Sequence, residues 1–137
     1  MLELESIRSA SVPQFSLGGT PVAGSSAVLV RGEFGLLYTS GLVAPKGPDG
    51  RGEIHVQVKA VLDQLRELVH QAGGEMKNVV KLIAWLPRRE DIATYASVRR
   101  EYFAEFPPAS TSVVCELVEP DILIEVEAIV AIASPAA

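Results

Sequence analysis

The chain has 137 residues, of which 48% are apolar and 21% charged, and its formal net charge is -5 at pH 7. These values exclude an intrinsically disordered chain and predict one globular domain, residues 1–137, with its own hydrophobic core. Because the chain has 17 acidic side chains and only 12 basic ones, its attraction to a phosphate backbone is weak, and we expect no nucleic-acid partner. The single cysteine excludes an internal disulfide and a cysteine-rich metal site.

The N-terminal segment, MLELESIRSA, carries acidic residues where a secretory signal carries positive charge. No apolar run in the sequence approaches the roughly 20 residues that a membrane-spanning helix requires. We therefore expect a cytoplasmic protein without a membrane partner.

The first third of the chain contains signals for strands. Residues 6–10 are a candidate strand, and two aliphatic runs, 27–31 and 36–40, are separated by a glycine-containing turn. This spacing predicts a β-hairpin. The stretch 44–52 is rich in glycine and proline and predicts a loop.

The middle of the chain predicts a helix followed by a central strand. Between residues 53 and 72, apolar side chains recur at helical spacing, and Gly73-Gly74 ends the pattern. Residues 79–86 are then apolar on both faces apart from one lysine and end at Pro87, as is typical of a strand inside a sheet.

The last third predicts a second helix and two strands. Helical spacing runs from Asp91 to Phe103, before a pair of prolines, and strands are predicted at 111–118 and 122–133. The order β-β-α-β-α-β-β predicts an α+β fold, with a single mixed β-sheet and two helices packed on one face.

Both faces of the last predicted strand carry apolar residues. One face has Ile122, Ile124, Val126, Ala128, Val130 and Ile132, and the other has Leu123, Glu125, Glu127, Ile129 and Ala131. Because two helices cover only one side of a sheet, we expect other copies of the chain to cover the second side. A cleft for a small molecule would then lie at a subunit boundary.

Five segments resemble the Rid family of reactive-intermediate deaminases, also called the YjgF or UK114 family. They are Tyr38-Thr39-Ser40-Gly41, Gln71-Ala72-Gly73-Gly74, Asn78-Val79-Val80-Lys81, Phe106-Pro107-Pro108-Ala109 and Ile124-Glu125-Val126-Glu127-Ala128-Ile129. The resemblance implies a chorismate-mutase-like α+β domain that forms a homotrimer. It also implies hydrolysis of imines and enamines, such as 2-iminobutanoate, to a keto acid and ammonia, without metal or organic cofactor.

The resemblance also assigns roles at a site between subunits. Glu125 corresponds to the glutamate that positions or activates water, and Ser40-Gly41 to the pair near which backbone groups complete the substrate pocket. The family's arginine, which grips the substrate carboxylate, is replaced by Ser110. Each guanidinium bond to a carboxylate contributes about 1.5 to 3 kcal/mol, whereas serine offers one neutral bond. We therefore expect weaker recognition of 2-iminobutanoate.

Further candidates share the segments that carry the resemblance. Ser112 shares a side with Ser110 if that segment is extended, and both are interpreted as pocket residues or as ordinary polar strand positions. Trp85 is a candidate cleft residue or a core aromatic. Glu127 lies on the same face as Glu125 and is the alternative ligand-facing carboxylate.

The remaining charged and metal-binding side chains give no further site. His55 and His70 lack the spacing of a zinc pair, so we expect surface positions and no metal. The arginine pairs 88–89 and 99–100 are interpreted as solvated charge, with a neighbouring subunit's arginine as a possible substitute for the absent one.

Three functions stay open. The first is hydrolytic deamination of an imine or enamine, and the second is a noncatalytic ligand-binding or regulatory trimer of the same family. The third, endoribonuclease or translation inhibitor, is disfavoured by the acidic balance of the chain.

Overall fold

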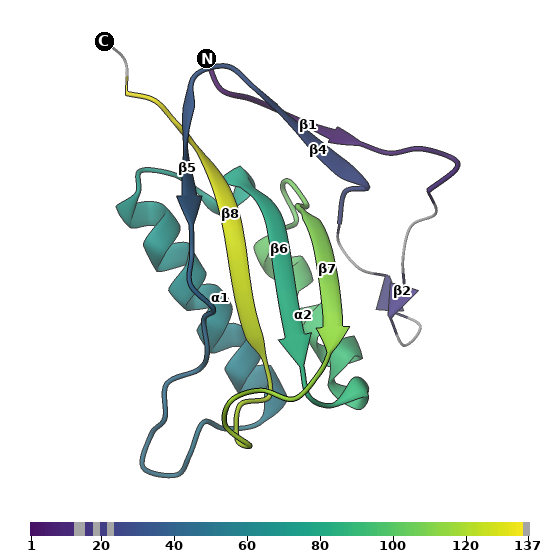
Figure 1. The fold of residues 1–137 in the computed structure, drawn as a ribbon, viewed down its shortest axis with the longest axis vertical. Coiled ribbons are helices and arrows are strands. Elements are labelled where there is room, and N and C mark those ends of the chain that lie inside the picture. Colours follow the sequence, from purple (N-terminus) through teal and green to yellow (C-terminus); the bar gives the residue numbers. More distant parts are fainter. Residues whose placement is uncertain (13–15, 18–19, 22–23, 136–137) are drawn as a thin grey trace.

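The computed structural model describes residues 1–12, 16–17, 20–21 and 24–135. In this part of the chain a mixed sheet has four strands in the order β5-β8-β6-β7 (Figure 1). The strands are β5 (Phe34–Tyr38), β6 (Val79–Leu86), β7 (Ala109–Val114) and β8 (Glu125–Ala133). β8 is antiparallel to β5 and β6, whereas β6 and β7 run parallel because a helix connects them.

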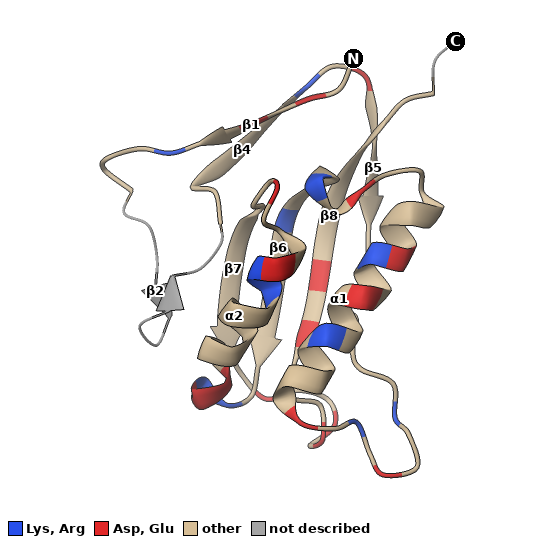
Figure 2. Cartoon of the chain, turned by 180° about the vertical axis from the view of Figure 1, so that it is seen from behind, with Lys and Arg blue, Asp and Glu red and all other residues tan. Residues whose placement is uncertain are grey.

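Helices α1 (Ile54–Gln71) and α2 (Ile92–Tyr102) pack on the same face of the sheet, as the view from behind shows (Figure 2). Two 3-10 turns, η1 (Met76–Asn78) and η2 (Arg89–Asp91), lead into β6 and α2 in the described chain. The buried stripe of α1 has helical spacing and consists of Gln57, Val58, Val61, Leu62, Leu65 and Val69. The predicted α+β fold, with two helices on one face of a mixed sheet, is confirmed. The prediction placed all strands in a single sheet, whereas the described strands form this four-stranded sheet and two separate two-stranded ribbons.

The predicted hairpin between residues 27–31 and 36–40 is wrong. Strand β4 (Ala27–Arg31) pairs with β1 (Glu3–Ile7), in a separate ribbon, and β5 pairs with β8. The pairing with β8 places the apolar side chain of Leu37 against the core, while Arg31 and Glu5 form an ion pair of 2.9 Å across the ribbon. The candidate strand at 6–10 is therefore found at Glu3–Ile7.

Other boundaries differ less. A short pair of strands, β2 (Ser16–Leu17) and β3 (Thr20–Pro21), lies in the N-terminal part. The predicted strand 111–118 is found at Ala109–Val114, and the predicted strand 122–133 at Glu125–Ala133. These two strands flank β6 on either side. No helix in the described residues is long and apolar enough to span a bilayer, and the cytoplasmic location stays a prediction.

The face of the mixed sheet opposite α1 and α2 is called the open face below. Along β8, Val126, Ala128 and Val130 are buried beneath the helices, whereas Glu125 and Glu127 lie on the open face, as the alternation predicts. In the described residues no helix covers this face. It therefore presents an apolar surface with two carboxylates on its central strand.

Candidate functional site

Glu125 is the first residue of β8, and its side chain is half-buried on the open face. Gly41 lies directly beside it, since a Cβ atom at Gly41 would overlap the Glu125 carboxylate. Any other residue at position 41 would push the carboxylate away. The bare backbone of Gly41 and the carboxylate of Glu125 therefore form one contact surface.

The Ser40-Gly41 pair interrupts the pairing between β5 and β8. Before the pair, the N–H of Thr39 donates to a β8 carbonyl at 3.0 Å. After it, Leu42 and Val126 exchange backbone hydrogen bonds of 2.7 and 3.1 Å. Between these anchors, the amides of Ser40 and Gly41 donate to no group in the described part of the chain. Short irregular segments of this kind present backbone N–H groups to polar ligand atoms.

Thr39 is a residue of the site that the sequence did not single out. Its hydroxyl accepts a hydrogen bond from the Ala128 N–H at 3.0 Å and donates to the Ser40 carbonyl at 2.9 Å. This side chain thereby fixes the start of the Ser40-Gly41 turn on β8. A threonine before Ser-Gly is a weak sequence signal, because threonine is common in strands.

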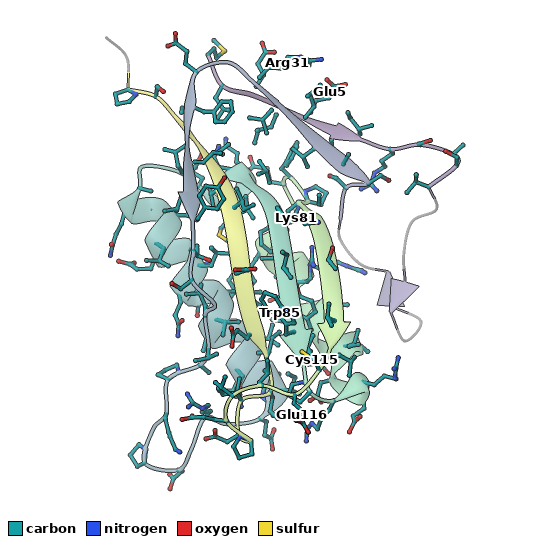
Figure 3. The ribbon with its side chains drawn as sticks, viewed as in Figure 1. Glu5, Arg31, Lys81, Trp85, Cys115 and Glu116 are labelled. Atoms are coloured by element: carbon teal, nitrogen blue, oxygen red, sulfur yellow. The ribbon has the colours of Figure 1, made fainter. Side chains whose placement is uncertain are left out.

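Trp85 and Glu127 also lie on the open face. Trp85 on β6 is the register partner of Glu125 on β8. Figure 3 shows Trp85 and Lys81 along the same strand. A small hollow of about 110 Å³ is lined by Lys81, Glu127 and Tyr38, among others. The open face thus brings together Trp85, both glutamates and the Ser-Gly turn.

Ser110 and Ser112 lie on the opposite face of the sheet from Glu125. Ser110 is in register with Leu82, and Ser112 with Ala84. Both partners are fully buried beneath the helices, and residues in register on neighbouring strands share a face. The serines therefore share one side, but within one copy they do not meet Glu125. Their assignment to the pocket stays a prediction.

Arg99 is fully buried, so its interpretation as solvated charge is wrong. Its Nη1 atom donates to the hydroxyl of Tyr95 at 3.1 Å, and its guanidinium carbon lies 5.4 and 5.5 Å from the ring centres of Tyr95 and Phe103. These aromatic residues stand four positions before and after Arg99 on the same side of the helix, where the planar guanidinium stacks on them. Arg88, Arg89 and Arg100 are exposed as predicted.

No group of three or more His, Cys, Asp or Glu side chains that could hold a metal ion occurs among the described residues. His55 and His70 are exposed on α1.

A mixed sheet with helices on one face and a half-buried carboxylate against a Ser-Gly turn on the other defines a class of small α+β proteins. A family model described as Endoribonuclease L-PSP matches residues 22–132 of the chain. The chain therefore belongs to this family, which is the YjgF or Rid family of the resemblance described above.

Individual relatives agree with this assignment. The RutC family protein PH0854 of Pyrococcus horikoshii is 32% identical over 112 residues, which are 80% of this chain and 87% of that protein. The RutC family protein PYRAB12510 of Pyrococcus abyssi is 35% identical over 79 residues, which are 58% of this chain and 62% of that protein, so the chain spans less than two thirds of this relative.

A solved structure has the same fold. YyfB from Yersinia pestis, described as a protein of unknown function of the conserved Rid protein family, matches with a TM-score of 0.71 at 25% identity. The match covers 94% of this chain and 98% of that chain. The chorismate-mutase-like, YjgF-like α+β fold implied by the resemblance is thereby confirmed.

Proposed function

We propose that the chain hydrolyses a small imine or enamine to a carbonyl compound and ammonia. The observation that carries this proposal is the half-buried carboxylate of Glu125 against the backbone of Gly41, with Trp85 in register on the next strand. A carboxylate partly withdrawn from water is suited to general acid-base catalysis. The amides of Ser40 and Gly41 are suited to hold a polar substrate atom.

In the proposed reaction, Glu125 accepts a proton while the oxygen of water bonds to the imine carbon. Glu125 returns this proton to the nitrogen, which gives the neutral carbinolamine. Glu125 then accepts the proton of the carbinolamine hydroxyl and passes it to the nitrogen, as the C–N bond breaks, the carbonyl forms and ammonia leaves. An enamine enters the same sequence by taking up a proton at carbon and giving up one from nitrogen, which converts it to the imine. The sum is imine plus water to carbonyl compound plus ammonia.

We further propose that the site is completed in a homotrimer in which residues 1–137 act as one domain. The open face carries apolar side chains without a covering helix in the described residues, and β7, which bears Ser110 and Ser112, is an edge strand. When copies cover one another's open faces, the edge strand of one copy can meet Glu125 of another. This arrangement would join the serines to the carboxylate.

The preferred substrate is proposed to lack the carboxylate of 2-imino acids. Ser110 stands where the family resemblance calls for arginine, and the open face itself carries the carboxylates of Glu125 and Glu127. Loss of two charge-assisted hydrogen bonds weakens carboxylate binding by roughly one to a few orders of magnitude.

Ammonia release from two freshly generated substrates tests the proposal. One is 2-iminobutanoate, and the other is an imine of similar size without a carboxylate. We expect acceleration over buffer for the second substrate and a kcat/KM at least about tenfold lower for the first. No acceleration of either substrate would reject the proposed chemistry.

Glu125→Gln tests the proposed catalytic residue, and Glu127→Gln is the matched control on the same strand. Loss of general acid-base catalysis should lower kcat by about 10²-fold or more in Glu125→Gln. Glu127→Gln should keep the rate within a few-fold. The reverse pattern would assign the role to Glu127, which was the alternative carboxylate.

A noncatalytic ligand-binding trimer is the second candidate function, because Ser110 removes the charged carboxylate clamp. A ligand that binds only the folded protein raises its Tm. A rise in Tm on addition of unreactive carbonyl or amide analogues, with no ammonia release from either imine, would favour this function.

The name of the family model mentions endoribonuclease activity, but we do not propose it for this chain. The net charge of -5 disfavours binding to a phosphate backbone. RNA binding that persists above physiological salt would overturn this conclusion.

A further inference from the structure

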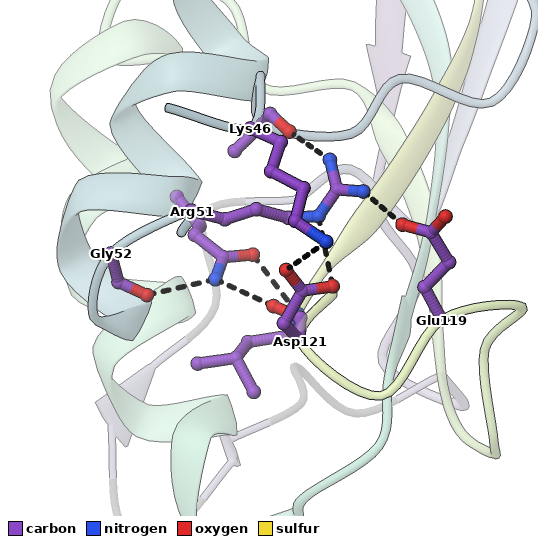
Figure 4. A network of polar contacts seen from close by, with 8 residues as sticks. Lys46, Arg51, Gly52, Glu119 and Asp121 are labelled. Carbon is purple, nitrogen blue, oxygen red and sulfur yellow. Dashed lines mark hydrogen bonds and ion pairs between the residues drawn. The ribbon is translucent and has the colours of Figure 1, made fainter. Parts of the chain in front are cut away.

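Arg51 stands at the centre of a polar network that links two distant loops (Figure 4). Its side chain is only 10% exposed. The guanidinium donates from Nη1 to the Ala44 carbonyl at 2.6 Å, from Nε to Oδ1 of Asp121 at 3.1 Å, and from Nη2 to the carboxylate of Glu119. One side chain therefore holds the loop after Ser40-Gly41 to the turn before β8.

Gln57 reinforces the same link from within the core. This side chain is fully buried, and its Nε2 donates to the carbonyls of Gly52 and Asp121 at 2.9 and 3.0 Å. Its Oε1 accepts a hydrogen bond from the Leu123 N–H at 2.9 Å. Since both donors and the acceptor are used, the turn before β8 has a defined position on the start of α1.

The two segments that Arg51 joins lead directly into the candidate site. Ala44 follows Gly41 by three residues, and Asp121 precedes Glu125 by four. At the site itself, the two segments are bonded to each other by the backbone pair of Leu42, which follows Gly41, and Val126, which follows Glu125. Arg51 therefore adds a second link between the same two segments, a few residues away from the contact of Gly41 with Glu125.

From this geometry we propose that Arg51 is a positioning residue that sets the place of the Glu125 carboxylate relative to the Ser40-Gly41 backbone. This inference rests on the function proposed above. Arg51 touches neither Glu125 nor the open face, so it acts through the chain segments that it holds.

The contacts of Arg51 differ from those of an ordinary surface ion pair. The pair of Arg31 and Glu5 has the same charges and a distance of 2.9 Å, but both side chains are 56% exposed. In contrast, the forked guanidinium of Arg51 donates to a backbone carbonyl and to two carboxylates. The ammonium group of Lys46 lies 3.7 Å from the Asp121 carboxylate as a second cation. A fork of this kind fixes orientation, which an ammonium group does less well.

The experiment compares Arg51→Gln, Arg51→Lys and the control Arg31→Gln. Displacement of a catalytic group by about 1 Å costs about 10²-fold in rate, so kcat for the better imine substrate should fall by about 10- to 100-fold in Arg51→Gln. KM should change by no more than about threefold, Arg51→Lys should recover part of the loss, and Arg31→Gln should behave as the unmodified protein. Equal kcat in Arg51→Gln and the unmodified protein would overturn the proposal.

A second readout separates this inference from the proposed reaction. With carbon-13 labelling of glutamate carboxyl groups, the chemical shift of the Glu125 carboxylate reports its surroundings, and the amide signal of Gly41 reports its backbone. We expect both to change in Arg51→Gln but not in Arg31→Gln, even if the unmodified protein hydrolyses neither imine. Unchanged Glu125 and Gly41 signals would overturn the positioning role.

If Arg51→Gln does not fold, Glu119→Gln replaces it, because the carboxylate of Glu119 is 50% exposed and its loss leaves the Ala44 and Asp121 contacts in place. A smaller change of the same two signals is then expected. No change would again overturn the proposal.

Discussion

At the scale of single residues, the contact between Gly41 and Glu125 decides how much change the site tolerates. A methyl group at position 41 would occupy the space of the carboxylate. Gly35 on the neighbouring strand has open space around its Cα and is a matched control. Neither Gly35 nor Gly41 has a positive φ angle, so the comparison concerns space rather than backbone strain.

We predict that Gly41→Ala lowers imine hydrolysis by about 10²-fold, because the displaced carboxylate no longer directs water at the substrate. Gly35→Ala should keep the rate within a few-fold. Steady-state kinetics with circular dichroism as a check of folding measures both variants. Equal activities of the two variants would show that the contact has no role in the reaction.

The ion pair of Arg51 and Asp121 should make stability depend on acid pH. The hydrogen bond from Arg51 holds the pKa of Asp121 below its ordinary value of 3.8. A carboxylate with a lowered pKa in the folded state stabilises the fold above its unfolded pKa, and this stabilisation is lost as the pH falls through the folded value.

We therefore predict that Arg51→Gln has a lower Tm than the unmodified protein at pH 7, and that the difference narrows as the pH is lowered below about 4. Thermal unfolding between pH 7 and 2 measures this difference. The Tm difference of Arg31→Gln, whose ion pair is exposed, should be close to zero throughout. If the Tm difference between Arg51→Gln and the unmodified protein does not change with pH, the effect assigned to Asp121 is wrong.

At the scale of elements, Tyr102 joins the two helices behind the sheet. Its hydroxyl donates to Oδ1 of Asp63 on α1 at 2.7 Å, and the guanidinium carbon of Arg66 lies 5.3 Å from the ring centre. Burial, together with the hydrogen bond to Asp63, raises the pKa of Tyr102 to about 12. The contact between α1 and α2 is therefore strongest when this phenol is protonated.

We predict that Tyr102→Phe lowers the free energy of unfolding by about 1 kcal/mol at pH 7 through loss of this hydrogen bond. Because the folded pKa is raised, the contribution of Tyr102 is complete below pH 10 and is lost as the pH rises towards about 12. Urea unfolding measures the difference in free energy of unfolding between Tyr102→Phe and the unmodified protein. This difference should be smaller above pH 10 than at pH 7. A gap that widens with pH would contradict the prediction.

At the scale of the whole molecule, the open face decides whether one copy is complete. Leu36 on β5 is 48% exposed on this face, whereas Val56 on α1 has a similar exposure of 47% on the other side of the molecule. A charge buried at an interface without a partner is strongly unfavourable. Introducing a glutamate at Leu36, with the same change at Val56 as the control, therefore tests whether the open face forms the interface of the proposed homotrimer.

We predict that native mass spectrometry finds a trimer for the unmodified protein and for Val56→Glu, and mainly monomers for Leu36→Glu. Circular dichroism should show both variants folded. If the unmodified protein is a monomer at micromolar concentration, the intersubunit site is wrong. If Leu36→Glu stays trimeric, a face other than the open one forms the interface.

Periodicity in the sequence predicted the elements whose burial follows directly from local spacing. The helix of α1, the strand of β6 and the alternation along β8 were confirmed. A stripe or an alternation of apolar residues is a local property that the chain shows before it folds. The glutamate on the last strand and the Ser-Gly pair were likewise visible, as parts of a resemblance that the family match supports.

Pairing partners and side-chain surroundings were decided only by the tertiary structure. Strand β4 pairs with β1 instead of β5, and Arg99 is buried between aromatic rings, because long-range contacts compete with local ones. The Arg51 network joins residues up to 70 positions apart and has no local pattern. Sequence alone thus determined which faces are apolar and which polar groups are candidates for a site, and the fold decided which of those groups meet.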